Sequence, residues 1–138
     1  ILYGIGRSKQ EIIQNASIAY SDIKIKQRFL EYCLPQMGKK VTNAIPGKSF
    51  HNYGLAVDMA PLDAQKQIDW NTKNPAWAKA GLYGEMAGME WAGKWISFRE
   101  YPHFQMSVTD CNKLFNIQMK HSSEVINYLF KFTEVWKF

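Results

Sequence analysis

Two short segments carry side chains whose types and spacing could do chemistry together. Residues 49–58 read SFHNYGLAVD and residues 100–105 read EYPHFQ, so the pair supplies His51, Asp58 and His103. Two imidazoles and one carboxylate can hold a catalytic zinc ion, because three protein ligands leave a fourth position for water. We therefore predict that these three side chains converge on one zinc ion.

Gly54 is the residue that would let the first segment turn. The separation of His51 and Asp58 is odd, so a straight strand would place them on opposite faces. Glycine tolerates backbone angles that other residues avoid, and a turn at Gly54 would bring both side chains to one point. Residues 55–60 then read as a short strand that carries Asp58.

Residues 103–108 are the second strand candidate. His103 and Gln105 would share one face of this strand, and Asp58 would lie opposite His103 if the two strands are antiparallel neighbours. Glu100, three residues before His103, is the natural general base: it could take a proton from water and return it to the leaving amine.

Single residues of these types often have a purely structural role. A histidine beside aromatic residues is more often a core or surface residue than a ligand. Asp58 is harder to explain in this way, because a carboxylate flanked by apolar residues is costly unless it is paired or bound to metal. The joint pattern is more specific than either half.

The elements around these segments are predicted from apolar spacing and turn residues. We expect helical segments at 8–34, 75–87 and 116–132. Ser21-Asp22 could cap a second helix, which would divide the segment 8–34 into a pair of helices. Residues 39–48 read as a loop, 63–67 as a turn, and 91–98 as a strand followed by a loop. No repeat or linker is present, so residues 1–138 are predicted to form one α+β domain, a small antiparallel sheet flanked by helices.

Composition sets wide bounds on function. The chain has 138 residues, 46% of them apolar, and a net charge of +5, which favours polyanionic partners such as wall polymers or nucleic acid. Only the charge supports a nucleic-acid-binding domain, since no such motif accompanies it. We expect a monomer with no membrane span and no visible signal peptide. The two cysteines, Cys33 and Cys111, could pair or remain buried thiols.

The motif Ser-x-His-x-x-Gly-x-Ala-x-Asp, followed later by an acidic residue, two residues and His, resembles the zinc D-Ala-D-Ala carboxypeptidase and L-alanyl-D-glutamate endopeptidase family. This family includes phage endolysins and bacterial wall-remodelling peptidases with a hedgehog-like α+β fold. Residues 88–95, 3–9 and 41–44 also look like family segments, so the resemblance covers most of the span 3–106.

The resemblance implies a zinc site, a base and a substrate cleft. The implied zinc ligands are His51, Asp58 and His103, the implied base is Glu100, and the implied cleft residues are Ser49, Tyr53 and Trp95. The implied substrate is the stem peptide of bacterial cell-wall peptidoglycan, reached by an exported enzyme or a phage lysin. An L-Ala–D-Glu endopeptidase cut is preferred over a D-Ala–D-Ala carboxypeptidase cut. A non-catalytic wall-binding or partner-binding zinc module is the rival interpretation.

Two departures from the family pattern shape further expectations. Members usually carry an upstream Tyr-Arg-Ser segment, so we expect the N-terminal part of the family domain to precede Ile1, or Arg7 or Arg99 to supply the arginine. Loss of an oxyanion donor can cost on the order of 10²–10³ in rate. Residues 11–40 exceed the usual connection and are interpreted as a helical insertion.

Several other side chains have a structural and a functional interpretation. The indoles of Trp91, Trp95 and Trp136 could stack on sugars, but core packing is the preferred explanation. His121 is expected on the surface, and Glu90 could pair with a lysine or support the site.

Overall fold

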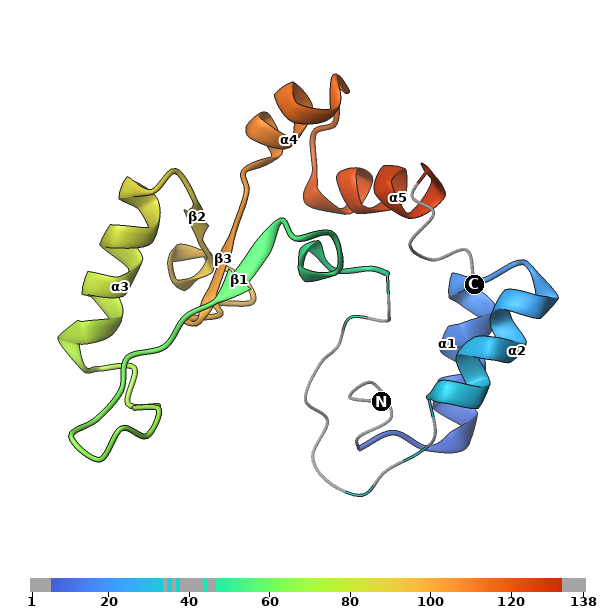
Figure 1. The fold of residues 1–138 in the computed structure, drawn as a ribbon, viewed down its shortest axis with the longest axis horizontal. Helices are drawn as coiled ribbons and strands as arrows, with labels where there is room; N and C mark the ends of the chain where they lie inside the picture. The colour runs from blue at the N-terminus through green and yellow to red at the C-terminus, as the bar shows by residue number, and fades with distance from the viewer. Residues whose placement is uncertain (1–5, 34, 36, 38–43, 45–46, 133–138) are drawn as a thin grey trace. The chain divides into compact units, whose positions relative to one another are not determined.

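The computed structural model describes residues 6–33, 35, 37, 44 and 47–132. The chain divides into two compact units, one made of residues 1–49 and 126–138 and the other of residues 50–125. Figure 1 shows the elements of each unit. The prediction of a single domain stays a prediction, as does the interpretation of residues 11–40 as an insertion.

The first unit is built on a pair of helices, α1 (Lys9–Ala19) and α2 (Ile23–Tyr32). The Ser8 hydroxyl accepts a hydrogen bond from the Glu11 N–H, and the Asp22 carboxylate accepts one from the Ile25 N–H, so each helix begins at a capping side chain. This confirms the predicted break at Ser21-Asp22. The buried core of the pair consists of Ile12, Ala16, Tyr20, Phe29 and Cys33.

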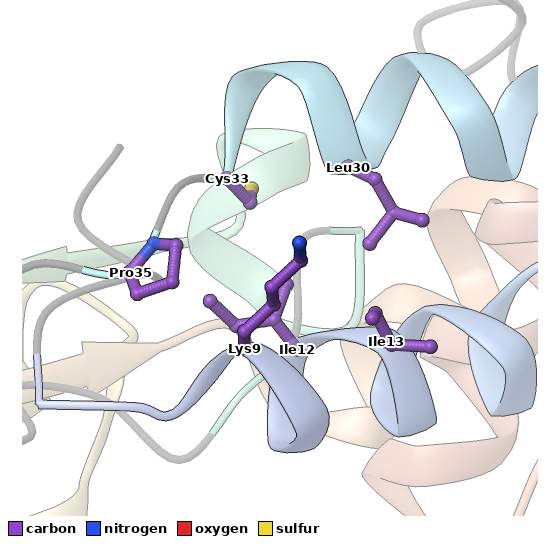
Figure 2. A pocket seen from close by; sticks show the side chains of 6 residues that line it. All are labelled: Lys9, Ile12, Ile13, Leu30, Cys33 and Pro35. Atoms are coloured by element: carbon purple, nitrogen blue, oxygen red, sulfur yellow. The ribbon is translucent and has the colours of Figure 1, made fainter.

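A small apolar pocket lies between these two helices (Figure 2). Lys9, Ile12 and Ile13 reach it from α1, and Leu30 reaches it from α2. Cys33 and Pro35 complete its lining. The predicted loop at 39–48 falls largely outside the described residues.

The second unit contains a three-stranded antiparallel sheet of β1 (Ala56–Asp58), β2 (Glu90–Trp91) and β3 (His103–Gln105), in the order β1-β3-β2. Two 3-10 turns, η2 (Phe50–Tyr53) and η3 (Ala92–Lys94), precede β1 and follow β2. The helix α3 (Pro75–Met86) begins with Asn74 as its cap and proline in its first turn. The α+β class with a small antiparallel sheet is confirmed.

Aromatic side chains fill the core of the second unit. Phe104 on the central strand is fully buried and stacks on Trp91 with ring centroids 6.2 Å apart. Trp91 is buried and its indole N–H donates to the Tyr101 carbonyl at 2.8 Å. Core packing is therefore the correct interpretation of Trp91, while Trp136 lies outside the described residues.

The strands are shorter than the sequence indicates, and one helix was not predicted. Residues 55–60 and 103–108 each form a strand of only three residues. Leu62 and Ile68 also form an isolated antiparallel bridge. The helix α4 (Val108–Phe115) replaces the end of the predicted second strand. Ser107 starts it by accepting from the Asp110 N–H, and Asn116 ends it in a left-handed conformation.

The last helix begins later than predicted. α5 runs over Ser122–Phe132 rather than from residue 116, and its Val125 and Leu129 side chains are buried as expected. The predicted turn at 63–67 is confirmed by a hydrogen bond from the Asp63 N–H to the Gln67 carbonyl. In the part of the chain that the structure describes, no helix is both long and apolar enough to cross a bilayer.

Candidate metal centre

The turn at Gly54 brings the first two candidate ligands together. His51 lies on η2, and Gly54 directly after it has a φ of +70°, a conformation that glycine adopts without strain. The Gly54 N–H donates to the His51 carbonyl at 3.3 Å. The chain then enters β1, which ends at Asp58. The predicted role of Gly54 as the turning point is confirmed.

The third candidate ligand arrives through the sheet register. β1 and β3 pair in antiparallel fashion with Asp58 directly opposite His103, as predicted. Opposed residues of an antiparallel pair have neighbouring side chains, so the sheet fixes the distance between this carboxylate and this imidazole.

The three side chains meet at one point. His51 Nε2 lies 3.0 Å from His103 Nδ1. Asp58 Oδ1 lies 3.4 Å from His51 Nε2 and 3.6 Å from His103 Nδ1. A tetrahedral ion with ligand atoms about 2.0 Å away holds each pair of those atoms about 3.3 Å apart. The three measured separations lie around this value, so this cluster can hold a metal ion.

The cluster is closed on one side and open on the other. The His103 side chain is 11% exposed, whereas those of His51 and Asp58 are 36% and 62% exposed. An ion held here would rest against the sheet through His103 and face solvent beside Asp58. Three ligands facing solvent leave room for a water in a fourth position, as in catalytic rather than structural zinc sites.

Further side chains hold the His103 ring. Its Nε2 lies 3.0 Å from the Gln105 Oε1 atom, and its ring centroid lies 5.6 Å from that of Trp95. The Trp95 indole N–H donates to Glu90 Oε1 at 2.6 Å. Of the two alternatives left open by the sequence, this contact favours support of the cluster through Trp95 over a pair with a lysine.

Glu100, the predicted base, lies on the turn that leads into β3. The His103 N–H donates to the Glu100 carbonyl at 3.3 Å, and the Glu100 N–H donates to the Ala92 carbonyl at 3.3 Å. The residue is half-buried. These two hydrogen bonds fix the backbone of Glu100 next to the start of the strand that carries His103. The catalytic role of Glu100 stays a prediction.

The remaining predicted residues have distinct positions. Trp95 packs on the imidazole ring of His103, and Tyr53 is half-buried on η2. Ser49 is half-buried and directly precedes η2, at the end of the other unit. The substrate-binding roles of these three residues stay predictions. His121 is exposed, as expected.

The two arginines considered as substitutes differ in availability. The Arg7 side chain is 1% exposed and its Nε lies 3.2 Å from Glu11 Oε1, so it is engaged inside the first unit. Arg99 is exposed and its Nε donates to the Trp95 carbonyl at 3.3 Å. Of the two, Arg99 is the one tied to a residue that contacts the cluster.

The α+β unit of residues 50–125 thus carries a cluster of three side chains that could hold a metal ion. Residues 42–106 match the family model described as D-alanyl-D-alanine carboxypeptidase, and this span contains the whole cluster. This segment is similar to that peptidase family, in agreement with the resemblance that the motifs indicated.

A curated relative matches over a similar length. The chain is 36% identical over 76 residues to the peptidoglycan L-alanyl-D-glutamate endopeptidase CwlK of Bacillus subtilis (strain 168). The match covers 50% of this chain and 46% of that protein. The chain thus spans about half the length of this relative.

Proposed function

We propose that this chain is a zinc-dependent peptidase that hydrolyses the L-Ala–D-Glu bond in the stem peptide of bacterial peptidoglycan. The observation that carries the proposal is the convergence of His51, Asp58 and His103 inside the segment that matches the peptidase family. The choice of bond rests on the named activity of the Bacillus relative.

Each side chain of the site has a task in this proposal. A zinc ion held by the three ligands would lower the pKa of a water to about 7 and polarise the scissile carbonyl. The Glu100 carboxylate takes a proton from the attacking water and delivers it to the leaving amine. Asp58 supplies negative charge and His103, buried against the sheet, fixes the position of the cluster.

Substrate binding is assigned to residues that neighbour the cluster in the structure or in the sequence. Trp95 packs against His103 and so forms a wall next to the reacting bond, and Tyr53 and Ser49 flank His51 in the sequence. Arg99, hydrogen-bonded to the Trp95 backbone, supplies a cation for a carboxylate of the stem peptide. The net charge of +5 favours adsorption to a wall that carries anionic polymers.

Digestion of purified peptidoglycan tests the bond that is cut. The zinc-loaded chain is incubated with purified wall, and new amino termini and released amino acids are identified. New D-Glu amino termini are expected. Release of free D-Ala without new D-Glu termini would contradict the endopeptidase assignment and favour the carboxypeptidase.

Glu100→Gln tests the catalytic step separately from metal binding. Loss of a general base typically costs 10²–10⁴ in rate, so hydrolysis should fall by about that factor while zinc affinity stays close to wild type. Glu31→Gln, on the exposed surface of α2, is the matched control and should keep full activity. If wild type and Glu100→Gln are equally inert but both bind wall, the chain is a binding module.

A further inference from the structure

We propose that Gln105 is the residue that positions His103 for metal binding, by holding its ring so that Nδ1 faces the ion. The inference deepens the proposed function and rests on the metal-binding role of His103 within it. Gln105 touches neither the substrate nor the ion, and acts through the imidazole alone.

The contact between the two side chains fixes where the ring proton lies. His103 Nε2 and Gln105 Oε1 are 3.0 Å apart. An amide oxygen carries no hydrogen, so with the amide in this orientation the imidazole nitrogen is the donor. With the proton on Nε2, the lone pair of a neutral His103 is on Nδ1. That is the atom facing His51 Nε2 at 3.0 Å and Asp58 Oδ1 at 3.6 Å.

Gln105 is itself held in one orientation. Its side chain is buried, with the residue 4% exposed, on the central strand of the sheet between Ala56 and Glu90. Its Nε2 donates to the Ser122 hydroxyl at 3.4 Å, and in this orientation the amide oxygen faces His103. A buried amide needs partners for both ends, and Ser122 and His103 provide them.

The strand geometry makes this pairing direct. His103 and Gln105 are two residues apart on β3, so their side chains leave the same face. The Trp95 ring also packs on His103, but its N–H is donated to Glu90 and it offers no acceptor to the imidazole. Gln105 therefore orients the ring, and Trp95 only limits its movement.

A neutral acceptor suits this position. Asp58 already brings one negative charge to the cluster, and a carboxylate at position 105 would add a second one in a buried place. The amide oxygen holds the N–H without that cost. Partners of this kind typically contribute 10–100-fold to metal affinity.

Zinc titration of paired variants tests the inference. Gln105→Met keeps the length of the side chain and removes the acceptor, whereas Gln105→Glu keeps an acceptor. Zinc dissociation constants are measured by competition with a chromophoric chelator. We expect Gln105→Met to bind zinc about 10–100-fold more weakly, and Gln105→Glu to recover most of the loss. Gln118→Met, at an exposed position, is the matched control and should not change the affinity.

Nitrogen-15 NMR of the histidines in the metal-free wild-type chain provides an independent readout. The His103 proton should reside on Nε2, and its resonance should shift in Gln105→Met. A proton on Nδ1, or equal zinc affinities for wild type and a folded Gln105→Met, would overturn the inference. So would a Gln105→Glu variant that is as stable as wild type, and so tolerates the buried charge, but binds zinc as weakly as Gln105→Met.

The two levels of the proposal can fail separately. A folded wild-type chain that binds no zinc would contradict the proposed function, and with it any role of Gln105 in metal binding. Zinc binding that is tight in wild type and unchanged in Gln105→Met would overturn the Gln105 inference while leaving the proposed function intact.

Discussion

Asp58 is the most exposed member of the cluster and its only carboxylate. Its side chain is 62% exposed, so little packing depends on it. The carboxylate nevertheless lies within 3.6 Å of both imidazole nitrogens that face it. Its contribution should therefore be to metal binding rather than to folding.

Asp58→Asn separates these two contributions. We expect zinc affinity to fall on the order of 100-fold, at or beyond the range seen for loss of a supporting partner. The free energy of unfolding of the metal-free chain should change by no more than about 0.5 kcal/mol, as for other exposed substitutions. Chelator competition and denaturant titration measure the two quantities. Unchanged zinc affinity would remove Asp58 from the ligand set.

The convergence of His51, Asp58 and His103 could be predicted from the sequence, because their residue types and the odd spacing of the first two are enough. An odd spacing with a glycine between His51 and Asp58 requires a turn, and a strand pair then places His103 opposite Asp58. The hydrogen bond from His103 to Gln105 was not predicted, although both were assigned to one strand face. It depends on side-chain rotamers and on Ser122, whose helix begins six residues later than the pattern indicated.

At the scale of elements, the Phe104 ring of the central strand lies directly against Gly84 of α3. A Cβ atom at this position would lie 2.3 Å from the ring of Phe104, which is fully buried. Phe104 lies between His103 and Gln105, so a shift of this ring would move β3 itself. Because Gly84 has no side chain, α3 can pack directly against the Phe104 ring and so hold the strand that carries His103.

Gly84→Ala should therefore destabilise the chain in spite of a better helix propensity. Alanine gains about 1 kcal/mol over glycine inside a helix, but overpacking costs about 1–3 kcal/mol. We expect a net loss in the free energy of unfolding, measured by denaturant titration, and weaker zinc binding. Ala78→Gly on the exposed face of the same helix reports the propensity alone. A more stable Gly84→Ala would show that the ring can move aside.

Elements with strong local signals were predicted well and those set by the sheet were not. The helices α1, α2 and α3 have capping side chains that are visible in the sequence. β2 is two residues long and has no readable alternation. The helix α4 was missed because apolar residues after His103 were assigned to the strand, although Ser107 and Asp110 form a readable cap.

At the scale of the whole molecule, the two thiols belong to different units. Cys33 lies in the first unit and Cys111 in the second, and both are free and buried. Burial raises the pKa of both thiols above their ordinary value. Of the two alternatives left open by the sequence, the structure has the buried free thiols.

Thermal unfolding with and without zinc tests the prediction of a single domain. One cooperative transition is expected, and zinc at 100 times its dissociation constant should stabilise the folded chain by about 2.7 kcal/mol. Differential scanning calorimetry measures both properties. All three ligands lie in the unit of residues 50–125. Two transitions, of which zinc raises the midpoint temperature of only one, would show that the units unfold independently.

The uneven exposure of the three ligands bears on how such a site would meet its substrate. Peptidoglycan is an insoluble, cross-linked network, and a network strand cannot diffuse into a closed cavity. With Asp58 62% exposed and His51 36% exposed, a tethered peptide could reach the cluster without leaving its network. Hydrolysis would then be a reaction at a solid surface. Its rate would depend more on the density of protein adsorbed on that surface than on the affinity for a single free peptide.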